Sequence, residues 1–143
     1  MAFDNILVVC VGNICRSPMA MALLQAQYLD KHIDSAGVSA AVGQPADTAA
    51  IEIMKAQKID ITDHISKQIT SELTVNADLI LTMSISEAKW IKSKWPHCRG
   101  KIFRLGHWLE KDIPDPYRHE FSAFEAAYQD IVASLKLWED KIS

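Results

Sequence analysis

The chain has 143 residues, and 49% of them are hydrophobic, which suits one domain whose core needs neither disulfides nor metal. Its 18 acidic and 15 basic side chains give a formal net charge of −3, without the basic surplus of a nucleic-acid-binding protein. We therefore expect a single domain over residues 1–143 that binds no nucleic acid.

The start of the chain predicts neither secretion nor membrane insertion. Residues 1–5 lack the positive region of a secretory signal, and the apolar run at residues 6–11 is too short to span a membrane. In a chain without a signal, Cys10, Cys15 and Cys98 are expected to be reduced thiols. A cytoplasmic location is the expectation that follows.

Strand and helix patterns alternate along the chain. The segments that predict strands are residues 5–11, 33–38, 78–83 and 101–105. The segments that predict helices are residues 19–29, 48–57, 86–95 and 121–142. This alternation indicates an α/β fold, a single-domain three-layer arrangement with a central four-stranded parallel sheet flanked by helices on both faces.

Local signals mark where the helices begin and which face they bury. Ser17 is placed to cap the first helix with Pro18 at its first position, and Asp47 is placed to cap the second. From Phe121 to Ile142, apolar residues recur at steps of three and four. That spacing predicts that one face of the last helix packs in the core.

Residues 10–18 read Cys-Val-Gly-Asn-Ile-Cys-Arg-Ser-Pro and connect the first predicted strand to the first helix. In parallel α/β sheets, ligands bind beyond the carboxyl ends of the strands. A tight loop of backbone N–H groups that leads into a helix suits a phosphate dianion. The predicted phosphate-binding residues are Val11, Gly12, Asn13, Ile14, Cys15, Arg16 and Ser17.

The residue types in this loop point to covalent phosphate transfer. Arg16 brings a planar, permanently charged fork, Gly12 allows close approach, and Asn13 tolerates a positive φ. The pKa of Cys10 is expected to be lowered by the helix N-terminus and the nearby cation, with Ser17 donating its hydroxyl. Sulfur would then attack phosphorus in line and form a phosphocysteine that water hydrolyses.

The sequence leaves two interpretations of Cys15 open. It is either a packing residue or a resolving thiol that forms a reversible disulfide with oxidised Cys10. Cys98, which lies between Pro96 and Gly100, is interpreted as incidental.

A phosphotyrosine leaving group has to be protonated as it departs, and Asp115 is the candidate acid. Prolines on both sides of it stiffen the backbone and fix the direction of its carboxyl group. Tyr117 is placed to stack against a phosphotyrosine ring. Pro-Asp-Pro also fits an ordinary surface turn, and Glu110 and Asp112 are less constrained candidates for the acid.

Together the two segments resemble the low-molecular-weight protein tyrosine phosphatases, whose pattern is Cys-x-Gly-Asn-x-Cys-Arg-Ser-Pro near the start and Asp-Pro-Tyr near the end. The likeness is closer to the bacterial members encoded with capsule or exopolysaccharide tyrosine kinases, and it is carried by residues 5–18, 35–37, 79–83 and 106–108. It implies that Cys10 is the nucleophile, Arg16 binds the phosphate, and Asp115 acts as acid and then base. It implies a phosphotyrosine protein substrate such as the tail of a bacterial tyrosine kinase. We also expect a monomer and no cofactor or metal.

The resemblance also implies that Asn13 holds the loop through Ser35 and His64. The positions that depart from the family pattern are Met21, Ser84 and Ala41. At the first two many members carry an acid, so local stabilisation there is open. At the third a large residue often faces the substrate ring, so the pocket wall and the substrate preference are open.

Two other function classes use parts of the same pattern. Arsenate reduction on this fold would use Cys10 but needs further cysteines to relay a disulfide, and only Cys98 is available besides Cys15. A phosphate carrier or phosphotyrosine-binding module needs neither Arg16 nor Asp115. Both leave the Asp-Pro-Tyr segment unexplained.

Overall fold

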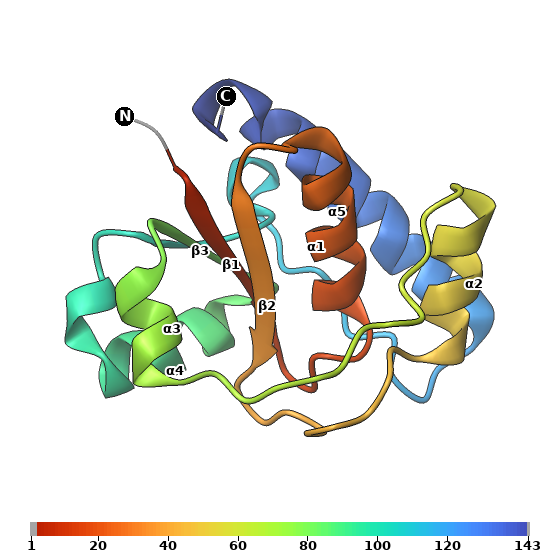
Figure 1. Cartoon of the computed structure of the whole chain (residues 1–143), viewed down its shortest axis with the longest axis horizontal. Coiled ribbons are helices and arrows are strands. Elements are labelled where there is room, and N and C mark those ends of the chain that lie inside the picture. Colours follow the sequence, from red (N-terminus) through yellow and green to blue (C-terminus); the bar gives the residue numbers. More distant parts are fainter. Residues whose placement is uncertain (1–2, 143) are drawn as a thin grey trace.

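A computed structural model describes residues 3–142, which form a four-stranded parallel sheet with helices on both faces (Figure 1). The strands, in the spatial order β2-β1-β3-β4, are β2 (His32–Gly37), β1 (Asn5–Cys10), β3 (Leu79–Thr82) and β4 (Ile102–Arg104). The helices are α1 (Arg16–Gln27), α2 (Thr48–Ala56), α3 (Ser71–Asn76), α4 (Ile85–Lys94) and α5 (Phe121–Ile142), with 3₁₀ turns η1 (Pro96–Cys98) and η2 (His107–Leu109). The predicted fold class is confirmed.

Strand β1 is central because its apolar run can be covered on both faces. It pairs with β2 from Asn5 opposite His32 to Cys10 opposite Gly37, and with β3 along its other edge. Every residue of β1 after Asn5 is buried. The strand therefore ends with its last side chain, Cys10, at the carboxyl edge of the sheet.

Alternate residues of β1 enter two separate cores. Ile6, Val8 and Cys10 pack with residues of α1, α2 and α5, whereas Leu7 and Val9 pack on the side of α3 and α4. Figure 1 shows α1, α2 and α5 on one side of the sheet and α3 and α4 on the other. In the part of the chain that the structure describes, no helix has the length and apolar character needed to cross a bilayer.

The predicted apolar face of the last helix is confirmed. Its buried residues are Phe124, Ala127, Tyr128, Ile131, Ser134, Leu135, Trp138 and Ile142. The indole Nε1 of Trp138 donates a hydrogen bond to the carbonyl of Leu105 at 2.8 Å, which fixes the helix against the segment after β4. Phe121, at the start of the helix, is exposed.

The predicted helix starts are confirmed in one case and wrong in another. Asp47 caps α2, and its carboxylate accepts the N–H of Ala49 at 3.0 Å. Ser17 does not cap α1, because the helix begins at Arg16, two residues before the predicted start at Pro18, with Cys15 in the capping position and no side-chain cap bond. The hydroxyl of Ser17 instead lies 2.9 Å from the sulfur of Cys10.

Candidate active site

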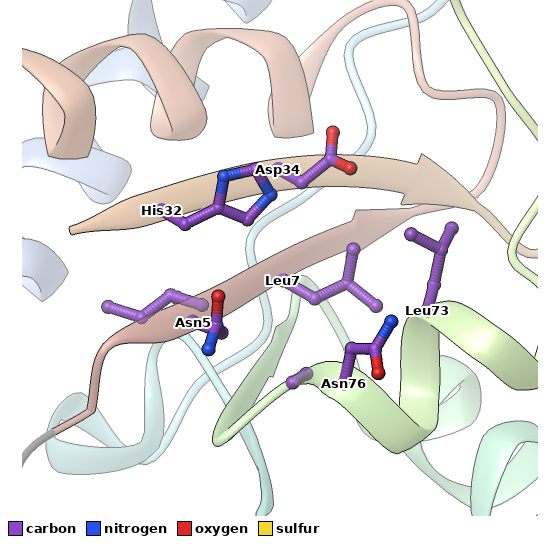
Figure 2. Close-up of a pocket in the computed structure, with 8 residues that line it drawn as sticks. Asn5, Leu7, His32, Asp34, Leu73 and Asn76 are labelled. Atoms are coloured by element: carbon purple, nitrogen blue, oxygen red, sulfur yellow. The ribbon is translucent and has the colours of Figure 1, made fainter.

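Pockets lie at both ends of β1, and they differ in chemistry. The pocket of about 290 Å³ at the amino end is lined by Asn5, Ile6, Leu7, His32, Asp34, Leu73, Asn76 and Ala77 (Figure 2). The pocket of about 260 Å³ at the carboxyl end is lined by Cys10, Val11, Gly12, Ile14, Cys15, Arg16, Ser39, Ala41, Asp115 and Tyr117. Only the second holds a thiol and a guanidinium, so the candidate active site is at the carboxyl end, where α/β folds bind ligands.

Asn13 organises the loop between β1 and α1. It is fully buried with a φ of 61°, a conformation that Asn tolerates better than most residues. Its side-chain Nδ2 donates to the hydroxyls of Ser17 at 2.8 Å and Ser35 at 3.0 Å, and its Oδ1 accepts the N–H of Lys67 at 2.9 Å. Its backbone N–H donates to the sulfur of Cys10 at 3.2 Å. One side chain thus joins the loop to β2 and to the segment before α3.

His64 supports the same loop from outside the pocket. Its Nε2–H donates to the carbonyl oxygen of Asn13 at 2.7 Å. Burial lowers the pKa of His64, partly offset by that hydrogen bond, and the charge of Lys67 lowers it further. The structure therefore places both Ser35 and His64 in contact with Asn13 and favours the neutral imidazole.

Gly37, which the sequence analysis did not single out, lies where a side chain would clash with the phosphate loop. A Cβ at Gly37 would lie 2.4 Å from the carbonyl oxygen of Val11 and 3.1 Å from the nitrogen of Asn13. A Cβ at Gly12 would meet only Ile14, at an ordinary 3.6 Å. The close backbone approach expected at Gly12 therefore occurs at Gly37, where β2 runs under the loop, and the positive φ belongs to Asn13.

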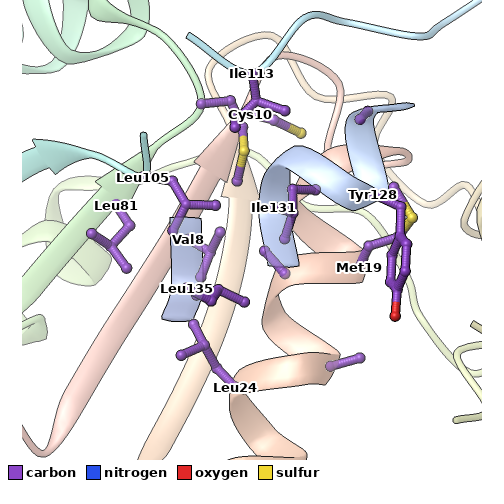
Figure 3. Packing of buried hydrophobic residues seen from close by; sticks show 14 of the residues in the cluster. Val8, Cys10, Met19, Leu24, Leu81, Leu105, Ile113, Tyr128, Ile131 and Leu135 are labelled. Atoms are coloured by element: carbon purple, nitrogen blue, oxygen red, sulfur yellow. The ribbon is translucent and has the colours of Figure 1, made fainter. Parts of the chain in front are cut away.

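Cys10 lies at the base of the pocket and is 2% exposed. Figure 3 shows it at the end of β1 above Val8, at the same end of the core as Ile113. Burial raises the pKa of its thiol, while Arg16, Ser17 and the amide of Asn13 lower it. The net direction is upward because burial is the largest influence, so the lowered pKa predicted from the sequence is wrong.

Arg16 is buried, and its guanidinium is held from several sides. Nη1 donates to the carbonyl of Ile113 at 2.7 Å. Nη2 lies 3.8 Å from Oε2 of Glu87 and 3.6 Å from Oδ2 of Asp115. Within residues 3–142, Nε has no hydrogen-bond partner. Since a buried N–H is normally paired, this donor suits an oxyanion in the pocket.

Asp115 is the acid that lines the pocket, whereas the two rival carboxylates do not. Its Oδ1 accepts the N–H of Tyr117 at 3.1 Å, so the surface turn expected from Pro-Asp-Pro is present. Its Oδ2 faces Arg16, and its side chain is 45% exposed. Asp112 instead pairs with Arg104 at 3.1 Å, and Glu110 is absent from the lining.

The other two thiols occupy different surroundings. Cys15 lines the pocket, and burial together with Asp47 raises its pKa to about 12, which favours the thiol form. Cys98 is fully buried in the core on the α3 and α4 side of the sheet, with Ile91 and Ile102. A disulfide relay from Cys10 through Cys98, as arsenate reduction would need, has no support in this arrangement.

Several contributors to the site were missed by the sequence analysis. They are Gly37, Ser39, Lys67, Glu87 and Ile113. Lys67 and Ile113 act through backbone atoms, which carry no residue-type signal. Glu87 did carry a sequence signal: it follows Ser84 by three residues, which is the capping-box pattern for the start of a helix, here α4.

Comparison with known proteins settles the family. The family model described as "Low molecular weight phosphotyrosine protein phosphatase" matches residues 5–143. The chain belongs to this family. The resemblance inferred from the two motifs is therefore confirmed.

Known proteins are similar to this phosphatase in sequence and structure along nearly its whole length. The low molecular weight protein-tyrosine-phosphatase Ptp of Acinetobacter johnsonii is 51% identical over 87% of this chain and 88% of its own. Wzb of Escherichia coli K12 is 42% identical over 99% of this chain and 97% of its own. The structure of Vibrio vulnificus Wzb in complex with benzylphosphonate matches with a TM-score of 0.93 and 43% identity, covering 98% and 99% of the two chains. The chain is accordingly a protein tyrosine phosphatase of the Wzb type.

Proposed function

We propose that the phosphatase hydrolyses phosphotyrosine through a phosphocysteine formed on Cys10. One observation supports this most directly: Cys10, Arg16 and Asp115 line a single pocket of about 260 Å³ at the carboxyl end of the sheet. Nucleophile, cation and acid are the three groups that transfer of a phosphoryl group from an aryl oxygen requires.

Phosphate binding is the first step. The loop residues Val11 to Ser17 surround the phosphate with backbone N–H groups at the start of α1, where the helix dipole favours an anion. Arg16 adds Nε and one N–H of Nη2, which lie on one edge of its guanidinium and suit two phosphate oxygens. These donors would stabilise the charge on the equatorial oxygens during transfer.

The thiol proton has to leave Cys10 before sulfur attacks, because burial raises the pKa of this group. A phosphate dianion in the loop can accept it. A thiol with a dianion carries the same protons and charge as a thiolate with a monoanion, so binding needs no outside base. The hydroxyl of Ser17, 2.9 Å from the sulfur, then donates to the thiolate.

Transfer and hydrolysis follow in two balanced steps. The bond from sulfur to phosphorus forms as the bond from phosphorus to the tyrosine oxygen breaks, and Asp115 gives its proton to that oxygen. The Asp115 carboxylate then takes a proton from water whose oxygen attacks phosphorus. The sulfur–phosphorus bond breaks, which releases inorganic phosphate and the Cys10 thiolate.

The pocket walls favour an aryl phosphate over a short alkyl one. Cys10 is at the base, while Val11 and Tyr117 are 38% and 44% exposed at the rim. A phosphotyrosine ring spans this depth and packs on those side chains, whereas a phosphoserine backbone would have to enter the pocket. Ala41 also lines the pocket, and its small side chain leaves more room there than the large residue that family members often carry.

The finer substrate proposal is the tyrosine-phosphorylated tail of a cognate bacterial autokinase that controls exopolysaccharide production. It is supported by the similarity to proteins named Wzb and by the sequence likeness described above. The guanidinium of Arg118 lies 5.3 Å from the ring of Tyr117, which puts a positive charge at the rim for an acidic phosphopeptide. We propose that the phosphatase acts in the cytoplasm as a monomer, without cofactor or metal.

The nucleophile is tested with a phosphotyrosine peptide, Cys10→Ser protein and Asp115→Asn protein. Cys10→Ser should abolish turnover while retaining phosphate binding. Rapid acid quenching of Asp115→Asn protein should trap phosphate on Cys10, found by mass spectrometry. Turnover by Cys10→Ser protein would refute the covalent route, and a wild-type phosphoprotein that persists for minutes would favour a phosphate carrier.

The acid is tested by the leaving group, with a matched control. Asp115→Asn should lower kcat by roughly 10²- to 10⁴-fold, most of all for aryl phosphates with poor leaving groups. Asp112→Asn, in the same loop but paired with Arg104, should leave kcat unchanged. Equal losses for good and poor leaving groups would assign Asp115 a role other than proton donation.

A further inference from the structure

Glu87 is a buried carboxylate that the proposed mechanism leaves unused. It lies in the first turn of α4, is 3% exposed, and is absent from the pocket lining. Its Oε2 is 3.8 Å from Nη2 of Arg16, which does line the pocket. A carboxylate buried to this extent is rare unless it is paired.

Its position is fixed by the start of α4. Oε1 accepts the backbone N–H of Met83 at 2.9 Å, and Oε2 accepts the hydroxyl of Ser84 at 2.7 Å. The hydroxyl of Ser84 in turn accepts the N–H of Glu87 at 3.4 Å. These bonds to Met83 and Ser84, which follow β3, hold the carboxylate in place independently of Arg16. A carboxylate fixed in this way can orient the guanidinium.

We propose that Glu87 is a positioning residue that holds the Arg16 guanidinium in the orientation that binds the transferring phosphate; this inference rests on the proposed function. A guanidinium has five N–H donors in one plane. Ile113 occupies Nη1, and Glu87 attracts one N–H of Nη2. The edge made by Nε and the second N–H of Nη2 is then directed to the phosphate.

Glu87 also limits the pairing between Arg16 and Asp115. Nη2 lies at similar distances from the two carboxylates, 3.8 Å from Glu87 and 3.6 Å from Asp115. Without the negative charge of Glu87, the cation would interact more strongly with Asp115, the group that has to carry a proton to the leaving oxygen. Removing that charge should therefore both misplace the phosphate ligand and draw the guanidinium towards Asp115.

The site differs here from the family pattern described above. Ser84 stands where many members carry an acid, and this chain supplies its carboxylate from position 87, one helical turn later. The hydroxyl of Ser84 is 2.7 Å from the Glu87 carboxylate, so an acid at position 84 would reach the same place. This geometry makes a rescue experiment possible.

The primary test compares Glu87→Gln with wild type on an aryl phosphate. Glu87→Gln keeps the size of the side chain and should lower kcat/KM about tenfold to a hundredfold, because a misplaced ligand costs that much. The inhibition constant of inorganic phosphate should rise. Glu72→Gln, an exposed acid in the first turn of α3, should leave both values unchanged.

The pH profile gives a readout that helix capping alone would not move. The titratable groups around Arg16 are Cys10 and Cys15 from the loop, Glu87 from α4 and Asp115 from the segment before α5. With the negative charge at position 87 removed, Arg16 should lower the pKa of Cys10 more strongly. The limb of the kcat/KM profile that follows Cys10 should therefore shift to lower pH in Glu87→Gln protein.

Rescue and a double-mutant cycle complete the test. Glu87→Ala combined with Ser84→Asp should recover at least half of the kcat/KM that Glu87→Ala loses. Glu87→Gln made in an Arg16→Lys background should cost less than in the wild type. Unchanged kcat/KM, phosphate inhibition and pH profile in Glu87→Gln protein, or fully additive losses with Arg16→Lys, would reduce Glu87 to a helix cap.

Failure of the proposed function would be seen separately. If wild-type protein showed no turnover dependent on Cys10, that function would fall. Calorimetric titration with inorganic phosphate would still decide the positioning role, since weaker binding by Glu87→Gln protein supports it and equal binding overturns it.

Discussion

The side-chain nitrogen of Asn13 lies 3.0 Å from the hydroxyl of Ser35, and this bond ties the phosphate loop to the neighbouring strand β2. The two residues are 22 positions apart in the chain. Because the same nitrogen also reaches Ser17, which contacts the sulfur of Cys10, three hydrogen bonds in series link β2 to the nucleophile. The shape of the loop is therefore set from outside the pocket.

Asn13→Ala should destabilise the fold and the loop together. It removes three side-chain hydrogen bonds at a fully buried position and places alanine at a φ of 61°, so we expect a loss on the order of 2–4 kcal/mol in the free energy of unfolding. Denaturant unfolding measures it. Asn13→Gly keeps the backbone freedom and should lose less stability but as much kcat/KM; equal unfolding losses would show that the φ value carries no cost.

The sequence predicts those parts of the fold that show a long pattern among neighbouring residues, and it fails where an element is short or a contact joins residues distant in the chain. The apolar run of β1 and the three-and-four spacing of α5 are long local patterns, and both were confirmed. Helix α3 was missed because its six residues are too few to show a period. The cap expected of Ser17 was wrong because that hydroxyl contacts Cys10, seven residues away, in place of the first amides of α1.

In the site too, local residue types were predicted and contacts made across the fold were missed. Cys10, Arg16 and Asp115 were predicted because their residue types carry the chemistry, and the structure gathers them at one pocket. Gly37 and Lys67 were missed since their contribution is a backbone contact made across the fold. The pKa of Cys10 was predicted in the wrong direction because burial depends on how the whole loop packs.

Lowering the pH should weaken the fold through His64. Burial lowers the pKa of His64 below its usual 6.5, so the folded protein binds this proton more weakly than the unfolded chain does. The stability contributed by neutral His64 is fully present above pH 6.5 and is lost as pH falls through the lower folded pKa. Free energies of unfolding measured across this window should show that decline.

The control variants for His64 separate its titration from its hydrogen bond. His64→Gln can still donate to the carbonyl of Asn13 but does not titrate, so its stability should change less with pH over the same window. His32→Gln, at an exposed position at the start of β2, should retain the wild-type dependence. A wild-type pH slope in His64→Gln protein would assign the decline to other groups.

Ser17→Ala should raise the pKa of Cys10 further. The Ser17 hydroxyl is among the groups that lower this pKa, so its removal leaves burial less opposed. The pH dependence of Cys10 alkylation by iodoacetamide, followed by mass spectrometry in a Cys15→Ala background, should move to higher pH. Ser134→Ala removes a buried hydroxyl in α5, far from the loop, and should leave the alkylation profile in place; a shift of equal size there would point to a general change in packing.

Gly37→Ala should displace the phosphate loop, because the new Cβ would meet backbone atoms that cannot rotate away. It would lie 2.4 Å from the carbonyl oxygen of Val11 and 3.1 Å from the nitrogen of Asn13. We expect the free energy of unfolding to fall by about 1–3 kcal/mol, as for other overpacked positions. We also expect kcat/KM to fall by a larger factor than the fraction of protein that is folded. Gly100→Ala, whose Cβ would meet no atom within 4 Å, is the matched substitution and should leave kcat/KM unchanged. If Gly37→Ala protein kept wild-type kcat/KM and phosphate inhibition, the loop would tolerate movement of β2, and the support that we assign to this strand would be wrong.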